Sequence, residues 1–420
     1  MPVPGTLLTL QIERPAVGGR MIARHDGAVV LVAGAIPGER VVARVERVQR
    51  RTLWARVVEV LDASADRVAS DDPVACGGNV LAHMTAARQV AIKSEMLADA
   101  FRRIGRLELA GTPVAESPAD GYRTRARVHV RGGRWGFFEE GSHRLCDVTG
   151  SRQMSPASAE GINRLCAAIA RAGAGVSAEI EWAETAGGDG RAAHITLEKA
   201  DGKAMATLGL IDGLDGASWS ATDREKEHLL WGDVHLVDHI DVSGHAGVPV
   251  LHHARSFFQG NRYLLQALVD DVVGRVRGDR VLDLYAGVGL FSVAAAAAGK
   301  TVVAVEGHDT AADDLRRNAA AYPSALTYRH NAVEAEMTLA TAARVDTVVV
   351  DPPRTGLSAE VSRALGAGGV PRIVYVSCDP ATLARDARVL VDAGYNLSDV
   401  RAYDLFPRTG HVETVLTLDR

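Results

Sequence analysis

The sequence has little cysteine, few aromatic residues and no long hydrophobic run. Its 420 residues include four cysteines, too few and too scattered for a disulfide framework: Cys76, Cys146, Cys166 and Cys378. No apolar run reaches the roughly 18 residues that a membrane-spanning helix requires. The opening residues, MPVPGTLLTLQ, lack the basic start and the cleavage site of a secretory signal. We therefore expect a soluble, cytoplasmic protein that does not bind membranes.

The composition excludes further classes of protein. With 47% hydrophobic and 24% charged residues, the chain can bury a core, so it is neither disordered nor collagen-like. Its length allows two or three domains. The net charge of −5 is uneven, because residues 1–60 contain nine arginines and five acidic residues, a local charge of +4. A basic segment on an acidic body indicates a polyanionic partner for this segment.

Residues 6–60 have the pattern of a small β-barrel. Apolar, strand-like runs alternate there with the turn signals Gly18-Gly19, Asp26-Gly27 and Pro37-Gly38. About five short strands in such a segment predict a barrel of the oligonucleotide-binding type. A barrel that merely decorates an enzyme is the alternative, and the arginines favour contact with nucleic acid.

The middle of the chain is predicted to be β-rich, after a helix that begins near Thr85. Residues 122–131 read YRTRARVHVR, so one face of a strand collects five basic or potentially basic side chains: Arg123, Arg125, Arg127, His129 and Arg131. Such a face can follow a phosphate backbone, and nearby aromatic residues are available for base stacking: Trp135, Phe137 and Phe138. A solvated outer face of an antiparallel sheet explains the pattern equally well.

From about residue 255 the pattern becomes that of an α/β sheet. Asn261 can cap a helix, and strand-like runs then alternate with helical stretches: VLDLYAG, TVVAVEG, TVVVDPP and IVYVSCD. Such alternation predicts βαβ units, a parallel sheet and a ligand at the carboxyl ends of its strands. We expect the catalytic domain here.

The first of these strands is followed by a glycine turn that is typical of a nucleotide-cofactor site. Gly287 and Gly289 let the backbone approach a ligand, and Glu306 ends the next strand, where a carboxylate can accept both ribose hydroxyls. Dehydrogenases and methyltransferases share this signal. Ser292 in place of a third glycine, and Asp283 within the strand, favour a methyltransferase that uses S-adenosylmethionine. A dehydrogenase, or a turn without a ligand, stays open at this point.

Two later strand ends carry candidate catalytic residues. Asp351 precedes two prolines that fix a rigid turn, and Arg354 stands where amine methyltransferases have an aromatic residue. Cys378 follows the strand IVYV, with Asp379 and Pro380 suited to cap a helix. A cysteine at such a strand end is a candidate nucleophile, although most free cysteines are small buried hydrophobes. The spacing cannot show whether Glu413 meets Cys378.

Five motifs in order resemble the RNA (uracil-5-)-methyltransferase family over nearly the whole chain: SFFQGN from 256, DLYAGVG from 283, DPPRTG from 351, SCDPAT from 377 and HVE from 411. Residues 1–60 look like the TRAM domain that many members carry. The resemblance implies a TRAM-like barrel (1–60), a β-rich, RNA-contacting central domain (61–250) and an α/β, Rossmann-like methyltransferase domain (251–420).

The resemblance also implies residue roles. Cys378 matches the nucleophile that adds to carbon 6 of uracil, and Glu413 matches the base that removes the proton from carbon 5. Six positions match residues that contact S-adenosylmethionine: Gln259, Tyr285, Gly287, Glu306, Asn331 and Asp351.

The sequence departs from the family at a cluster site. Many relatives hold an iron–sulfur cluster on four cysteines, but the matching stretch here, DDPVACGGNVLAHM, keeps only Cys76. The later stretch DVTGSRQM has no cysteine, and Cys146 precedes it out of register. Because such a cluster takes four ligands, we predict that this protein holds none. In the glycine loop, Ala286 and Leu290 replace a cysteine and an asparagine that relatives often have.

The expected reaction is methylation of carbon 5 of a uridine in structured RNA, by a monomer. The TRAM-like barrel favours ribosomal RNA over tRNA, because relatives that act on tRNA often lack it. The alternatives are a tRNA substrate, a catalytically silent RNA-binding protein, and an NAD-dependent oxidoreductase. A cytosine carbon 5 methyltransferase is a nearer alternative, but those enzymes place cysteine where this chain has Arg354.

Overall fold

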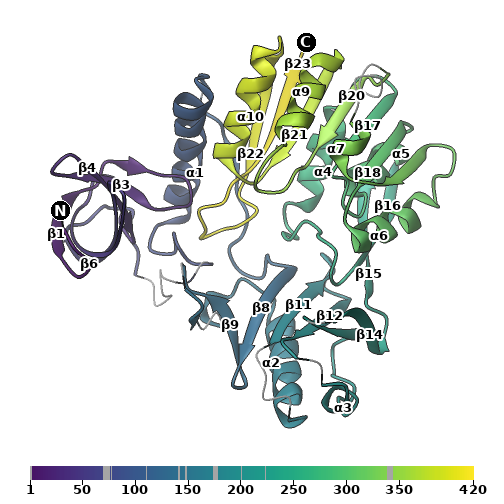
Figure 1. The fold of residues 1–420 in the computed structure, drawn as a ribbon, viewed down its shortest axis with the longest axis horizontal. Helices are drawn as coiled ribbons and strands as arrows, with labels where there is room; N and C mark the ends of the chain where they lie inside the picture. Colours follow the sequence, from purple (N-terminus) through teal and green to yellow (C-terminus); the bar gives the residue numbers. More distant parts are fainter. Residues whose placement is uncertain are drawn as a thin grey trace.

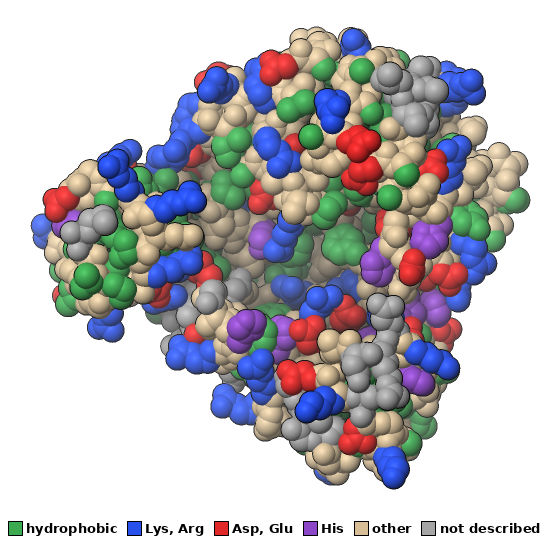
Figure 2. All heavy atoms as spheres, in the orientation of Figure 1, with side chains coloured by type: hydrophobic (Ala, Val, Ile, Leu, Met, Phe, Trp, Pro, Cys, Tyr) green, Lys and Arg blue, Asp and Glu red, His purple; other side chains and the backbone are tan. Residues whose placement is uncertain are grey.

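The computed structural model describes residues 2–69, 76, 78–109, 111–140, 142–146, 149–173, 178–199, 201–222, 224–337 and 344–420. Three bodies follow one another along the chain: a small N-terminal barrel, a central sheet and a larger C-terminal α/β unit (Figure 1). They surround a hollow on the face shown in Figure 2. In the described part of the chain, no helix has the length and apolar character needed to span a bilayer.

The N-terminal barrel is a six-stranded sheet in the order β1-β5-β6-β4-β3-β2. Its strands are β1 (Leu7–Gln11), β2 (Arg14–Pro15), β3 (Met21–His25), β4 (Ala28–Ala33), β5 (Arg40–Gln49) and β6 (Thr52–Asp62). Alternate residues point inward, as Leu8 and Leu10 do in β1, so each strand contributes one apolar face to the core. Asp26 and Gly27 both have positive φ and form the tight turn that their sequence predicts.

The central body is a seven-stranded sheet with helices against it, in the order β10-β9-β8-β11-β12-β13-β14. Its strands are β8 (Arg125–Arg131), β9 (Arg134–Phe138), β10 (Leu145–Cys146), β11 (Ala178–Glu184), β12 (Arg191–Leu197), β13 (Gly216–Ala221) and β14 (Arg224–Gly232). Its helices are η2 (Thr149–Ser151), α2 (Pro156–Arg171) and α3 (Gly202–Met205). Gly161 of α2 lets Trp182 pack closely, because a Cβ there would lie 2.5 Å from the indole.

The C-terminal body is built on an eight-stranded sheet in the order β19-β18-β17-β20-β21-β23-β22-β7. Its strands are β7 (Val114–Ala115), β17 (Arg280–Leu284), β18 (Thr301–Glu306), β19 (Leu326–His330), β20 (Thr347–Val350), β21 (Arg372–Ser377), β22 (Asn396–Tyr403) and β23 (Glu413–Asp419). Its helices are α4 (Leu265–Gly274), α5 (Leu290–Ala297), α6 (Asp309–Ala319), α7 (Val333–Glu336), α9 (Ala359–Gly368) and α10 (Pro380–Asp392). Strands β17 to β21 are parallel, whereas β23 is antiparallel to its neighbours.

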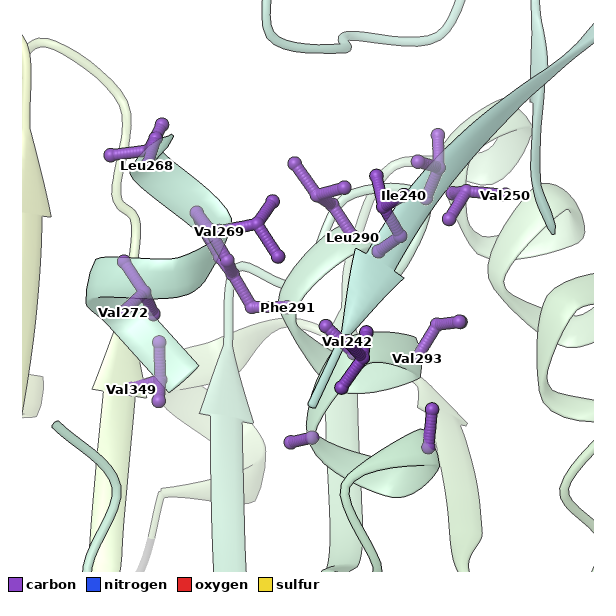
Figure 3. Packing of buried hydrophobic residues seen from close by; sticks show 14 of the residues in the cluster. Ile240, Val242, Val250, Leu268, Val269, Val272, Leu290, Phe291, Val293 and Val349 are labelled. Atoms are coloured by element: carbon purple, nitrogen blue, oxygen red, sulfur yellow. The ribbon is translucent and has the colours of Figure 1, made fainter. Parts of the chain in front are cut away.

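A separate hairpin completes the core of this body. Strands β15 (His235–Val242) and β16 (His245–His253) pair with each other, and their apolar side chains pack against α4 and α5 (Figure 3). The alanine-rich α5 is buried on all sides, since sheet, hairpin and helices cover it. Gly299, at φ +82°, follows the end of α5 and is suited to terminate it.

The linker between barrel and central sheet forms α1 (Ala86–Ala100) and the π-helical turn η1 (Phe101–Gly105), which pack on α10 of the C-terminal body. Helix α1 begins where the sequence predicts, and Thr85 caps it by accepting a hydrogen bond from the Arg88 amide. Strand β7 then joins the C-terminal sheet beside β22. This segment therefore ties the barrel to the C-terminal body.

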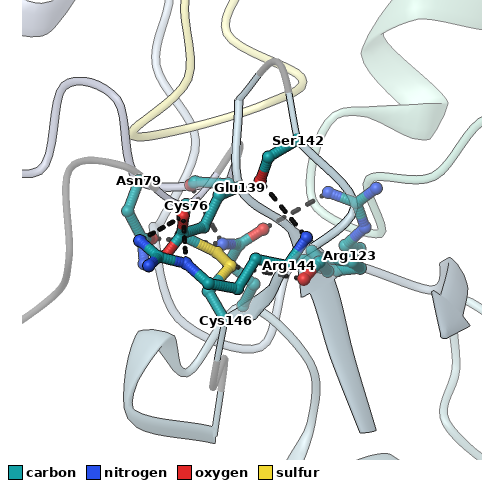
Figure 4. Close-up of a disulfide and its surroundings, with 10 residues drawn as sticks. Cys76, Asn79, Arg123, Glu139, Ser142, Arg144 and Cys146 are labelled. Carbon is teal, nitrogen blue, oxygen red and sulfur yellow. Dashed lines mark hydrogen bonds and ion pairs between the residues drawn. A yellow bond between two sulfur atoms is a disulfide. The ribbon is translucent and has the colours of Figure 1, made fainter. Parts of the chain in front are cut away.

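Two cysteines that are 70 residues apart form a disulfide, Cys76–Cys146 (Figure 4). Cys76 forms an isolated antiparallel β-bridge with Glu139. Strand β10 pairs with β9, which brings Cys146 next to Cys76. Nothing in the spacing of the cysteines predicts this bond, because it depends on how the β9–β10 hairpin folds back. Cys166 and Cys378 are free.

Candidate active site

The predicted site residues gather at one edge of the C-terminal sheet. Tyr285, Glu306, Asn331, Asp351 and Cys378 each lie at or directly after the end of a parallel strand. Because the carboxyl ends of parallel strands meet at one edge, residues distant in the sequence become neighbours there. The expectation of a parallel sheet with its ligand site at this edge fits the observed topology.

The glycine turn between β17 and α5 is shaped to admit a ligand. A Cβ on Gly287 would meet nothing within 4 Å, whereas one on Gly289 would lie 2.6 Å from Leu315. Gly289 thus allows close helix packing, and Gly287 leaves open space beside the backbone. Glu306 supports the turn by accepting hydrogen bonds from the amides of Gly287 at 2.8 Å and His308 at 2.7 Å.

A buried polar pair lies beside this turn. Gln259 donates its amide to Asp351 at 3.3 Å, and its own Oε1 is buried without a hydrogen-bond partner. Asp283 accepts a hydrogen bond from Ser292 through one oxygen, and its other oxygen has no partner. Burial raises the pKa of Asp283 and that of Asp351 to about 7 each. The charge of Asp283 adds to the rise for Asp351. Unpaired buried oxygens of this kind indicate a missing polar partner.

The structure brings all six predicted cofactor residues together. Gln259, Tyr285, Gly287 and Asp351 line one pocket, which Phe257 and Phe291 also border. The amide of Asn331 donates to the carbonyl of Glu306 at 3.0 Å, so these two residues adjoin the pocket through the Gly287 turn. The Tyr285 hydroxyl bonds Glu334, and burial raises the pKa of this tyrosine.

Cys378 and Glu413 lie opposite each other. Ser377 pairs with Thr414 across the antiparallel strands β21 and β23, so the next position on each strand end is Cys378 and Glu413. Asp379 caps α10 through the amides of Ala381 and Thr382, as predicted. The strand end and the helix cap therefore position Cys378, and the pairing of β21 with β23 brings Glu413 next to it.

The environment of this pair favours neutral side chains. Burial, followed by the charge of Glu413, raises the pKa of the Cys378 thiol to about 12, while Arg354 opposes the rise. Burial and the nearby Asp351 raise the pKa of Glu413 well above its ordinary value. The dipole of α10 therefore does not make Cys378 a stable thiolate by itself.

Two residues of the site carry no role in the sequence-based prediction. Arg354 contacts the Cys378 thiol and places its guanidinium 3.4 Å from Nε2 of His411. Burial and the charge of Arg354 lower the pKa of His411 to about 4, so this imidazole is neutral. The signal for Arg354 was its place directly after the rigid Asp351-Pro-Pro turn.

Comparisons with known proteins identify the family. Family models match in two places, the TRAM domain over residues 4–58 and the tRNA (Uracil-5-)-methyltransferase family over residues 225–420. The chain is similar to the 23S rRNA (uracil(1939)-C(5))-methyltransferase RlmD of Halomonas elongata, with 35% identity over 98% of this chain and 89% of that protein. The chain belongs to the RNA (uracil-5-)-methyltransferase family.

Further relatives agree with this assignment. RlmD of Methylococcus capsulatus is 33% identical over 100% of this chain and 98% of its own length. An uncharacterized RNA methyltransferase of Streptomyces avermitilis is 33% identical over 98% of this chain and 97% of its own. A tRNA (uracil-54, C5)-methyltransferase of Pyrococcus abyssi, solved with S-adenosyl-L-homocysteine, superposes with a TM-score of 0.76 at 25% identity, covering 98% of this chain and 100% of that one. The protein is thus an S-adenosylmethionine-dependent RNA (uracil-5-)-methyltransferase with an N-terminal TRAM domain.

In this methyltransferase, the basic side chains of β8 (Arg125–Arg131) do not form one continuous basic face. Alternation along β8 is observed, but Arg125 turns inward to the Ala254 carbonyl, and Arg127 pairs with Glu181. His129 stacks on Phe138 with ring centres 3.6 Å apart. Two arginines of β8 are therefore engaged within the protein, Arg125 by the 252–254 segment and Arg127 by Glu181 of β11.

In the methyltransferase, Cys76, the one cysteine of the stretch DDPVACGGNVLAHM, forms a disulfide with Cys146. No group of three or more potential metal ligands occurs among the residues that the structure describes. Residues 71–75, 77 and 147–148 of the two cluster-like stretches lie outside those residues. That the protein holds no iron–sulfur cluster stays a prediction.

Proposed function

We propose that this enzyme transfers a methyl group to carbon 5 of a uridine in 23S ribosomal RNA through a covalent bond between Cys378 and the base. The observation that carries the proposal is the register of β21 and β23, which sets Cys378 opposite Glu413 beside the pocket of Asp351 and Gln259. A nucleophile, a carboxyl base and a methyl-donor pocket thus meet at one sheet edge.

The pocket fits S-adenosylmethionine, which supplies a methyl group on a positively charged sulfur. Glu306 would accept the ribose hydroxyls, and the unpaired oxygens of Gln259 and Asp283 offer buried acceptors for polar groups of the cofactor. Asn331 and Tyr285 would complete the adenosine side. Phe257, which is 64% exposed, and Phe291 form the aromatic border of this pocket.

The residues of the chain account for the chemistry at the base. The Cys378 thiol gives up its proton to solvent and its sulfur bonds carbon 6 of the uracil ring. The electrons of the carbon 5–carbon 6 double bond then shift toward the carbon 4 carbonyl as an enolate, which makes carbon 5 nucleophilic enough to accept a methyl group. Glu413 then takes the proton from carbon 5, and the electrons of that bond restore the double bond as the cysteine leaves. Glu413 takes this proton in its ionised form, and the burial and the nearby Asp351 that raise its pKa make that carboxylate a stronger base. Arg354 is placed to favour the thiolate during addition.

The choice of ribosomal RNA rests on the RlmD relatives, which match over nearly the whole chain. The uridine must leave its stack to reach Cys378, at a cost of a few kcal/mol, which contacts elsewhere on the RNA must offset. We assign to those contacts the TRAM barrel (1–60) and the predicted central domain (61–250), apart from its β15–β16 hairpin, which packs in the core of the C-terminal body, and we assign catalysis to residues 251–420. We propose that the enzyme acts as a monomer in the cytoplasm, where ribosomal RNA is found.

The test is methyl transfer from labelled S-adenosylmethionine to unmodified RNA. Cys378→Ala should abolish transfer while cofactor binding by calorimetry stays unchanged, and Cys166→Ala, which alters the other free cysteine, should retain transfer. Mapping of 5-methyluridine in ribosomal RNA and tRNA of a deletion strain identifies the substrate. Loss of the modification from tRNA alone would contradict the ribosomal assignment, and transfer by Cys378→Ala would contradict the covalent mechanism.

A further inference from the structure

A second pocket opens between the central sheet and the C-terminal body. It measures about 190 Å³, and three of its eight lining residues are arginines, against one glutamate. Arg125 and Arg127 come from β8, Arg255 follows β16, and Glu181 is the acidic residue. Phe257 lines both this pocket and the cofactor pocket, so the two share a wall.

Arg125 makes no direct ion pair with a described carboxylate. Its half-buried guanidinium donates to the Ala254 carbonyl at 2.6 Å and to Nδ1 of His252 at 3.3 Å. Burial lowers the pKa of this guanidinium to about 10, and the charges of Glu181, Asp314 and Asp238 oppose that shift from beyond ion-pair distance. Because its direct partners are a carbonyl and an imidazole, the guanidinium can still take an anionic partner in the pocket.

The orientation of Arg125 is tied to the cofactor pocket. His252 donates Nε2–H to Asp238 at 2.8 Å, which leaves Nδ1 as the acceptor for Arg125. The same imidazole stacks on Phe258, with ring centres 4.3 Å apart, one residue before Gln259. The guanidinium is therefore held rigidly beside the segment that forms the methyl-donor pocket.

The other two arginines are held more loosely. Arg127 is 62% exposed and pairs with Glu181 at 2.7 Å, and Arg255 is 30% exposed and lies 3.6 Å from Glu227. Arg127 is exposed enough for a phosphate to compete with Glu181, and the 3.6 Å separation of Arg255 from Glu227 leaves the Arg255 guanidinium without a close ion pair.

We propose that this pocket binds a backbone phosphate of the RNA next to the uridine that enters the active site. The inference rests on the proposed function, because a base that leaves its stack carries its flanking phosphates to the mouth of the pocket. Arg125 supplies a fixed positive charge there, and Arg127 and Arg255 close on the phosphate from the two sides. In this proposal, β8 contacts the RNA backbone at one phosphate rather than along its whole length.

The test compares Arg127→Gln and Arg255→Gln with Arg171→Gln, an exposed control at the end of α2. Arg125 is left intact, because it also holds the Ala254 and His252 backbone segment. The probe is an unmodified 23S rRNA transcript, with binding measured between 50 and 200 mM salt. For each test variant we expect the slope of log affinity against log salt to fall by about 1, as for one lost phosphate contact. KM for the RNA should rise about tenfold with kcat unchanged, and Arg127→Lys should recover most of the binding.

Unchanged slopes and KM values in both test variants would overturn the inference, as would an equal effect of Arg171→Gln or a fall in kcat alone. These outcomes are separate from failure of the proposed function, in which the wild-type enzyme would leave the 23S rRNA transcript unmethylated. Binding slopes need no turnover, so they report on the phosphate site in either case.

Discussion

At the scale of single residues, the site is dominated by carboxyl groups that burial makes hard to ionise. The pKa values of Asp283 and Asp351 are raised to about 7, and that of Glu413 is raised well above its ordinary value. Their charges would repel one another in a desolvated space, so each makes the next harder to ionise. Cofactors and bases that carry positive charge or donate hydrogen bonds relieve this repulsion when they bind.

The first prediction concerns Glu413. Glu413→Gln should let the cysteine add to the base and the methyl group transfer, but the carbon 5 proton would stay, so elimination should stall. A covalent enzyme–RNA complex should therefore accumulate and be visible as a shifted band in denaturing gels. Cys378→Ala combined with Glu413→Gln should give no such band. Normal turnover by Glu413→Gln would remove this residue from the mechanism.

The second prediction concerns pH. Below about pH 7, Asp351 and Asp283 hold protons, and above it they become anions, so affinity for the positively charged S-adenosylmethionine should rise from pH 6 to pH 8. S-adenosylhomocysteine, which lacks the sulfonium charge, should show a smaller change. Calorimetry at several pH values measures both, and Asp351→Asn should flatten the profile. A steeper profile for S-adenosylhomocysteine would contradict this electrostatic account.

At the scale of structural elements, the segment that delivers Glu413 is held from outside its own sheet. The carbonyl of Leu405 accepts from the Asn261 side chain at 2.9 Å, and the Arg408 amide donates to Gln89 of α1 at 2.9 Å. Gly410 lies so close to the barrel that an added Cβ would come within 2.3 Å of the Gly18 carbonyl carbon. Residues 404–412 are therefore the junction of α1, the TRAM barrel and the active site.

The strongest of these ties is ionic. Lys93 of α1 is fully buried, pairs with Asp404 and donates to the Phe406 carbonyl at 2.9 Å. Lys93→Met should leave Asp404 buried and unpaired, and lower the free energy of unfolding by about 3–5 kcal/mol. Urea unfolding measures this loss. Lys93→Met with Asp404→Leu should recover much of the stability, and a single variant as stable as wild type would contradict the assignment.

At the scale of the whole molecule, the disulfide joins Cys76, between β6 of the barrel and α1, to β10 of the central sheet. It closes a loop of 70 residues, so it restricts the unfolded chain, and its removal should cost about 2–4 kcal/mol. Cys146→Ser should therefore lower the unfolding midpoint of the oxidised protein. Reductant should lower the midpoint of the wild type but not that of Cys146→Ser, and Cys378→Ala serves as the control. A reductant effect that persists in Cys146→Ser would contradict the role of this bond.

The sequence by itself determined whatever follows from local rules. Strand ends, the helix start near Thr85, the cap at Asp379 and the Gly287 turn depend on neighbours within a few residues, so they could be predicted one element at a time. These sufficed to predict the layered α/β unit and a small N-terminal barrel, and the resemblance carried by the five motifs added the TRAM assignment and the six cofactor residues.

Tertiary structure alone decided which distant residues meet. Cys378 and Glu413 face each other because of an antiparallel register, and Cys76 meets Cys146 because a hairpin folds back. Arg125 leaves the basic face predicted for β8 because the 252–254 segment packs against it. Such contacts depend on how whole elements pack, and packing is set by the burial of many side chains at once rather than by any short stretch of sequence.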